Sequence, residues 1–138
     1  PAYLDRPFGL NMLEYDPAHP EQKSFIVNEL LAIFKQLYGD VPESMGPAFE
    51  QYFRNATQLV MEDPESGSTM MDIGRVLSNA EFRNRKLARS NNLIVNQFWT
   101  EIATRAEGEA SLANIVPYIT NKFDEFTTND FMRPIIGQ

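Results

Sequence analysis

The chain has 138 residues, 43% of them apolar, and a net charge of −7 at neutral pH. This is enough for one domain with a buried core, while the lack of Cys and the single His exclude disulfides, thiolate chemistry and multi-histidine metal sites. No apolar run approaches the ~18 residues of a membrane span and no signal-peptide pattern begins the chain, so we expect a cytoplasmic protein with no direct membrane insertion.

The N-terminal stretch differs from the rest of the chain. Pro7, Gly9 and Pro17 interrupt it, so we expect an extended arm over residues 1–18. After Pro20, apolar residues recur at the three- and four-residue steps of an amphipathic helix. This stripe predicts a helix that ends at Gly39, and it consists of Ile26, Leu30, Ile33, Phe34 and Leu37.

A second apolar stripe follows Pro47, which fits the first turn of a helix because no N–H donor is needed there. Residues 63–68 are rich in turn formers and predict a loop. The apolar stripe between Pro47 and this loop consists of Phe49, Tyr52, Phe53, Ala56, Leu59 and Val60.

Three further helix starts can be located, two from capping residues and one from a break. Thr69 and Asp72 have the spacing of a capping box, Asn79 is expected to cap a segment that reaches about Arg89, and residues 91–92 mark a break before a helix over residues 93–105. A short helix after Thr69 is indicated by Met71, Ile73, Val76 and Leu77.

The helix over residues 93–105 is expected to place Ile94, Phe98 and Ile102 along one face, with Val95 and Trp99 beside it. Trp99 is therefore predicted to lie in the core next to Phe98, and not on the surface as a binding anchor.

A last helical stripe extends from residue 112 to residue 126, with a kink at Pro117, and residues 134–138 are expected to be extended. The prediction is an all-α fold: a compact bundle of five to seven short helices over residues 19–133, in a single domain spanning residues 1–138.

Catalytic motifs are not found in the sequence. No Gly-Lys pair exists, which excludes the common phosphate-binding loop, no Ser neighbours a plausible base, and the acidic residues are scattered over loops and polar faces. His19, in a loop, is expected to be an ordinary surface residue. The chain is thus predicted to have no catalytic residues, no metal and no cofactor.

Charge is spread unevenly. Residues 1–70 hold 11 acidic and 4 basic residues, whereas residues 71–108 hold 4 acidic and 6 basic residues. Arg85, Lys86 and Arg89 would share one stripe of a helix. The candidate partner-binding residues, for a phosphate or an acidic partner, are Arg83, Arg85, Lys86 and Arg89. The alternative is a solvated helix face whose basic residues pair with acidic residues elsewhere in the chain.

Several segments, in this order, carry a resemblance to a known family. They are RPFGLNMLEYDPAHPEQ, FEQYFRNATQLVMEDP, TMMDIGRVLSNAEFRNRKL, VNQFWTEIATRAEGEA and IVPYITNKFDEFTTNDFMRPIIGQ. The pattern resembles the helical insertion of type IV secretion coupling ATPases and related HerA/FtsK-like conjugative ATPases. The matching positions are Arg54–Asn55, Phe98–Trp99 after Phe82–Arg83, Pro117, Asn121–Lys122 and residues 133–138.

The resemblance implies an all-α domain excised from a larger ATPase, between its two nucleotide-binding motifs. It implies a non-catalytic role at the cytoplasmic face of the inner membrane, where the domain would engage protein substrates or DNA-processing accessory factors. The alternative is a helical module that binds DNA directly through residues 83–89. A small independent enzyme is the third possibility, and the motif inventory gives it no support.

Overall fold

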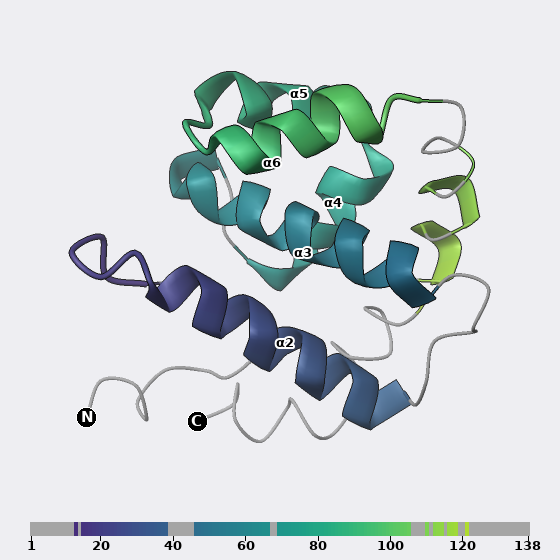
Figure 1. The fold of residues 1–138 in the computed structure, drawn as a ribbon, viewed down its shortest axis with the longest axis horizontal. Coiled ribbons are helices and arrows are strands. Elements are labelled where there is room, and N and C mark those ends of the chain that lie inside the picture. The colour runs from purple at the N-terminus through teal and green to yellow at the C-terminus, as the bar shows by residue number, and fades with distance from the viewer. Residues whose placement is uncertain are drawn as a thin grey trace.

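The computed structural model describes residues 13, 15–38, 46–66 and 69–105, together with residues 110, 112–114, 116–118 and 121. Over these residues the secondary structure is helical, without strands, and the helices pack compactly (Figure 1). The predicted all-α class is therefore confirmed. No helix in the described part of the chain is long and apolar enough to cross a membrane.

The two longest helices are α2 (Gln22–Tyr38) and α3 (Gly46–Glu62), which run in opposite directions in Figure 1. Lys23 of α2 pairs with Glu62 of α3, and Lys35 pairs with Glu50. The stripe predicted for α3 is confirmed, since all six of its members are buried. This wide and mostly apolar face makes α3 the central helix, with α2 on one side of it and α4 and α5 packed against it as well.

In α2 the buried face is shifted from the predicted one. Leu30 is buried as expected, but Val27 and Leu31 complete the buried face, while Ile26 and Ile33 are only partly buried. The apolar residues of α2 form a face that is wider than its contact with α3. Packing against α3 therefore decides which of them are fully buried. The side chains of the other two predicted members, residues 34 and 37, lie outside the described part.

The predicted helix starts of α4 (Met70–Ser78) and α5 (Ala80–Arg89) are confirmed. The Asp72 carboxylate accepts hydrogen bonds from the Thr69 N–H and hydroxyl, both at 2.9 Å, and Asn79 accepts from the Phe82 N–H at 3.0 Å. Met71, one of the four apolar residues that indicated this helix, is exposed. Met70 occupies the buried position instead, because it lies one turn before Ile73 on the face that packs against α3.

The helix predicted over residues 93–105 is irregular. It consists of α6 (Leu93–Gln97), capped by Asn92, and a π-helical segment, η3 (Phe98–Ile102), in which the Ala103 N–H donates to the Phe98 carbonyl at 2.9 Å. The face predicted for it is wrong at both ends, since Ile94 and Ile102 are exposed. At Ile102 the cause is the wider turn of the π-helix, which places an extra residue in the ring and rotates the side chain away from an α-helical stripe.

The chain outside these helices is described in part. The loop predicted over residues 63–68 contains a 3₁₀ turn, η2 (Pro64–Ser66), and its last two residues lie outside the described part. Of the predicted arm, residues 1–12 lie outside it, Leu13 is buried, and the His19 N–H closes a turn on the Asp16 carbonyl at 2.8 Å. Helical turns are present at residues 112–114 and 116–118, whereas residues 134–138 are outside the described part.

Candidate functional site

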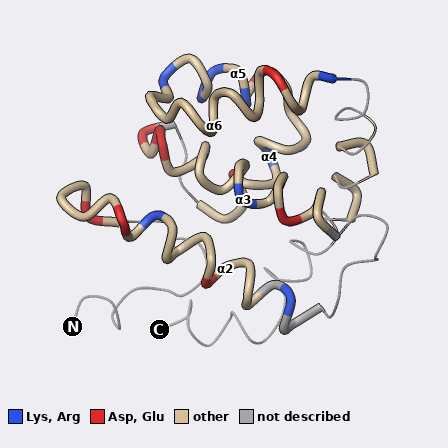
Figure 2. The backbone as a smooth tube through the Cα atoms, viewed as in Figure 1, with Lys and Arg blue, Asp and Glu red and all other residues tan. Residues whose placement is uncertain are grey.

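The basic segment of α5 is divided between two environments. Lys86 is fully buried and Arg83 is partly buried, whereas Arg85 and Arg89 are exposed. The four candidate partner-binding residues therefore do not form one solvated surface. Figure 2 shows basic residues gathered on α5, while acidic residues gather in the stretch before α2.

Lys86 connects α5 to the end of α3. Its ammonium group donates hydrogen bonds to the Asp63 carbonyl at 2.7 Å and to the Val60 carbonyl at 3.3 Å. Helix C-termini leave such carbonyls unpaired and carry partial negative charge, so a cation is stabilised there. Burial lowers the pKa of Lys86, and the nearby charges of Asp63 and Asp72 act in the opposite direction. Lys86 therefore has a structural role, and it does not belong to the solvated stripe that was predicted for α5.

Arg83 makes an equivalent contact with α4. Its guanidinium donates to the carbonyl of Val76, in the last turns of α4, at 2.7 Å, and lies 5.1 Å from the ring centroid of Trp99. Burial lowers the pKa of Arg83, but an arginine remains charged at neutral pH. Through these hydrogen bonds Arg83 connects α5 to α4, and Lys86 connects α5 to the end of α3.

Beneath Arg83 lies an aromatic cluster. Phe98 and Trp99 pack edge to face with centroids 5.0 Å apart, and Tyr52 of α3 packs on both, at 5.0 Å from Phe98 and 5.9 Å from Trp99. The Trp99 Nε1–H donates to the Asn55 carbonyl at 3.2 Å. Trp99 is only 2% exposed, which confirms the prediction that it belongs to the core next to Phe98.

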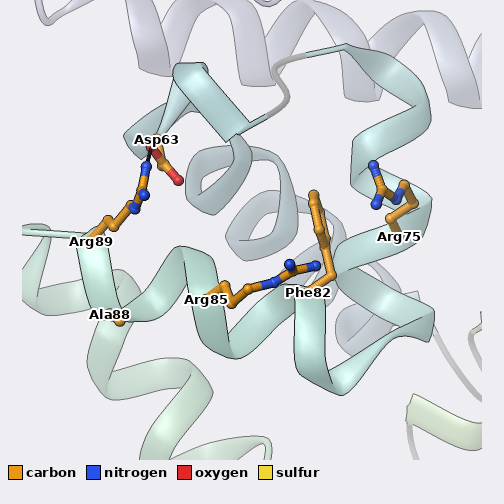
Figure 3. Close-up of a pocket in the computed structure, with 6 residues that line it drawn as sticks. All are labelled: Asp63, Arg75, Phe82, Arg85, Ala88 and Arg89. Carbon is orange, nitrogen blue, oxygen red and sulfur yellow. Dashed lines mark ion pairs between the residues drawn. The ribbon is translucent and has the colours of Figure 1, made fainter.

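The exposed side of α5 forms an open pocket of about 470 Å³. Figure 3 shows the ring of Phe82 between Arg75, which comes from α4, and Arg85. The two guanidinium carbons lie 4.0 Å and 6.0 Å from the ring centroid, distances typical of cation–π contacts. The residues that line the pocket are Asp63, Arg75, Phe82, Arg85, Ala88 and Arg89.

Two buried carboxylates hold arginines of this pocket in place. Asp72 pairs with Arg75 at 3.1 Å, and Asp63 lies 3.6 Å from Arg89, the contact dashed in Figure 3. Within the described part of the chain, no carboxylate pairs with Arg85. The lining thus carries three guanidinium groups against one carboxylate. Planar guanidinium forks of this kind match carboxylate or phosphate oxygens.

Sequence reasoning identified Arg85 and Arg89 but missed Arg75, Phe82 and Asp63. These three residues come from α4, the buried face of α5 and the end of α3, so their proximity depends on how the helices pack. The sequence did contain a signal for Arg75, which was the capping box. Its acidic residue, Asp72, lies one helical turn before Arg75 and can therefore pair with it.

Other candidate chemistry is limited among the described residues. They contain no group of three or more His, Cys, Asp or Glu side chains that could hold a metal ion. His19 is exposed, as predicted, and contacts the exposed Glu21 at 3.2 Å. Comparisons with protein-family models, curated proteins and solved structures found no match.

Proposed function

We propose that this chain is a non-catalytic recognition domain of a type IV secretion or conjugative DNA-transfer ATPase. In this proposal the domain engages protein substrates or DNA-processing accessory factors through the exposed arginines of α5 and α4. The observation that carries it is the open pocket on α5, whose lining includes three arginines from two helices, Arg75, Arg85 and Arg89. The order of the sequence motifs described above supports the choice of parent protein.

Positioned arginines favour recognition over a general electrostatic role. Arg75 and Arg89 are each held by a buried carboxylate, so little side-chain freedom is lost when a ligand binds. A solvated helix face that only improves solubility does not need arginines that are positioned by buried carboxylates. The alternative of an ordinary polar surface fits Arg105, which is exposed and has no such pair within the described residues, better than it fits the pocket.

Direct binding of DNA is the second candidate, because arginines also bind phosphates. Of the arginines on α4 and α5, Arg75, Arg85 and Arg89 are exposed, and three phosphate contacts would give a salt slope of roughly −3 on a log–log plot. The charge of −7 repels DNA at long range. We therefore expect no DNA affinity tighter than the roughly 10⁻⁴–10⁻⁶ M of non-specific binding.

The proposal places the domain at the cytoplasmic face of the inner membrane, in contact with the rest of the parent ATPase. The nucleotide-binding motifs belong to that parent, so the domain alone is expected to neither bind nor hydrolyse ATP. A fluorescent ATP analogue titrated into the domain tests this part. Saturable, Mg²⁺-dependent binding in the micromolar range would contradict it.

The recognition role is tested by reversing the charge of two exposed residues, Arg85→Glu with Arg89→Glu, in the parent ATPase. We expect reduced capture and transfer of its protein substrate, with an unchanged far-ultraviolet circular dichroism spectrum. Arg105→Glu is the matched control and should leave transfer unchanged. Fluorescence anisotropy with labelled single- and double-stranded DNA is the parallel measurement. Submicromolar, salt-sensitive DNA binding that the double variant abolishes would favour the DNA-binding alternative.

A further inference from the structure

We propose that the outer face of α6 is a self-association surface, against which the same face of a second copy of this chain packs. This α6 face consists of Leu93, Ile94 and Gln97, all three of them exposed. The helix packs on α3, on the opposite side from α2 (Figure 1). The inference is independent of the proposed function, because the α6 face uses none of the residues that line the arginine pocket.

The first argument is the exposure of two consecutive aliphatic side chains. Leu93 and Ile94 are 81% and 79% exposed, the highest values for large apolar residues in the described part of the chain. Leu and Ile are usually buried in a folded domain. Gln97 follows them by four and three residues, so the three side chains are neighbours on the surface of α6. They form one continuous surface with an apolar centre.

The second argument is that the α6 face has a fixed position. The Asn92 side chain caps the helix by accepting from the Val95 N–H at 3.2 Å, and the Asn96 side chain donates to the Ser90 carbonyl at 2.9 Å. Val95, between these two residues, is fully buried. Because α6 is held from its inner side, a partner loses little free energy in ordering the surface that it meets.

The third argument is charge, and it favours a second copy as the partner. Residues 90–100 contain no Asp, Glu, Lys or Arg, although 22% of the chain is charged. Arg89, just before this run, points toward Asp63 (Figure 3). Two copies that each carry a charge of −7 repel one another. In a two-fold contact the same surface patch of both copies meets, so an uncharged patch avoids facing its own charge.

The polar residues at the two ends of the apolar pair fit the same interpretation. Asn91 and Gln97 are exposed, and each carries an amide group. An amide has both hydrogen-bond donors and acceptors, so it can pair with an identical amide across a two-fold axis. A carboxylate or an ammonium group cannot pair with its own copy in this way. The α6 face is therefore self-complementary in its polar rim as well as in its apolar centre.

The size of the α6 face predicts a weak dimer. Burial of one exposed Leu or Ile side chain removes roughly 100 Å² of apolar surface from water, so the two apolar pairs contribute roughly 400 Å². Stable interfaces bury about 1,200–2,000 Å² in total, and transient ones bury less. We therefore expect a reversible dimer that dissociates more readily than the about micromolar limit of standard-size interfaces.

The first test uses the absence of Cys from the chain. Gln97→Cys places one thiol on the α6 face, and mild oxidation joins two chains only where their thiols approach closely. We expect Gln97→Cys to cross-link at least about tenfold faster than Met71→Cys, because association raises the local thiol concentration. Met71→Cys is the matched control, since residue 71 is exposed on α4. Equal rates for the two variants would overturn the inference.

Adding Leu93→Ser and Ile94→Ser to Gln97→Cys removes the apolar centre and should return the cross-linking rate to that of the control. Both side chains are exposed, so the substitutions should leave thermal melting unchanged, which shows that the variant folds. An undiminished rate in this variant would overturn the inference, because the thiols would then meet without the α6 face.

Sedimentation equilibrium of the intact chain gives an independent readout. The average mass should rise toward that of a dimer with protein concentration, and more so in high salt, which screens the repulsion between like-charged copies. Ile94→Lys and Ile94→Glu should each stay monomeric alone, while their mixture associates because opposite charges then meet. A parent chain that stays monomeric, an average mass that falls with salt, or a mixture that stays monomeric would overturn the inference. Each is the result expected if a different protein covers the α6 face.

Discussion

The two sides of α5 carry the same kind of residue and use it differently. On the inner side, the positive charges of Lys86 and Arg83 lie against the terminal carbonyls of α3 and α4. On the outer side, Arg85 and Arg89 are exposed beside Phe82. Four cations within seven residues therefore divide between holding three helices together and presenting donors to a ligand.

The comparison teaches that charge density in a sequence does not by itself identify a binding surface. A cation near a helix C-terminus satisfies carbonyls that would otherwise be unpaired, and these hydrogen bonds offset part of the cost of burying its charge. Only the cations left over by such contacts are available to a partner. In this domain the inner pair positions α5, and α5 in turn presents the outer pair.

The inner side depends on the aromatic cluster below Arg83, and Trp99→Ala is expected to have the largest effect on stability. Loss of this buried side chain should lower the free energy of unfolding by about 3–5 kcal/mol, measured by urea denaturation. Trp99→Phe keeps most of the packing but loses the hydrogen bond to Asn55, so it should cost less. A melting temperature for Trp99→Ala within a degree or two of the parent domain would contradict the core assignment.

Lys86→Ala is expected to have the next largest effect, about 2–4 kcal/mol, because it removes a buried methylene stem and the donor for two carbonyls. Lys86→Met keeps the stem and should cost less. Urea denaturation at pH 7 measures both variants. If Lys86→Met were as stable as the parent domain, the hydrogen bonds to α3 would contribute nothing to stability, and the contrast between the two sides of α5 would be lost.

The pH dependence of stability gives a smaller effect. Burial lowers the pKa of Lys86 in the folded state, so between that pKa and the ordinary value near 10.5 the unfolded chain binds more protons than the folded chain. Stability contributed by this residue should therefore rise with pH across that window. The measurement is the difference in unfolding free energy between the parent domain and Lys86→Met at pH 7, 9 and 10. A difference that falls with rising pH would contradict the assignment.

The outer side should show the smallest effects on stability. Arg85→Ala is expected to change the free energy of unfolding by less than about 0.5 kcal/mol, since the side chain is exposed. Arg89→Ala should cost up to about 1 kcal/mol, because its partner Asp63 is buried while the arginine itself is mostly exposed. Thermal melting in low and high salt measures both. A large loss for Arg85→Ala would show that it acts structurally, like Lys86.

Much of the local structure followed from the sequence. The capping box of Thr69 and Asp72 and the cap residue Asn79 marked helix starts correctly, because each pairs a side-chain oxygen with a backbone N–H only three residues away. All six residues predicted for the apolar stripe of α3 are buried, although Met61 was missed. Each of these features depends on contacts within one turn or on strict helical periodicity, so the sequence alone was sufficient.

The tertiary structure decided which residues of a wide apolar or basic face turn inward. It buried Met70 and left Met71 exposed, shifted the core face of α2 to Val27 and Leu31, and left Ile94 exposed. It also buried Lys86 and brought Arg75 to the pocket. These outcomes depend on carbonyls and rings contributed by other helices far away in the chain. The periodicity of one helix, which the sequence does determine, contains no information about the neighbour that it will meet.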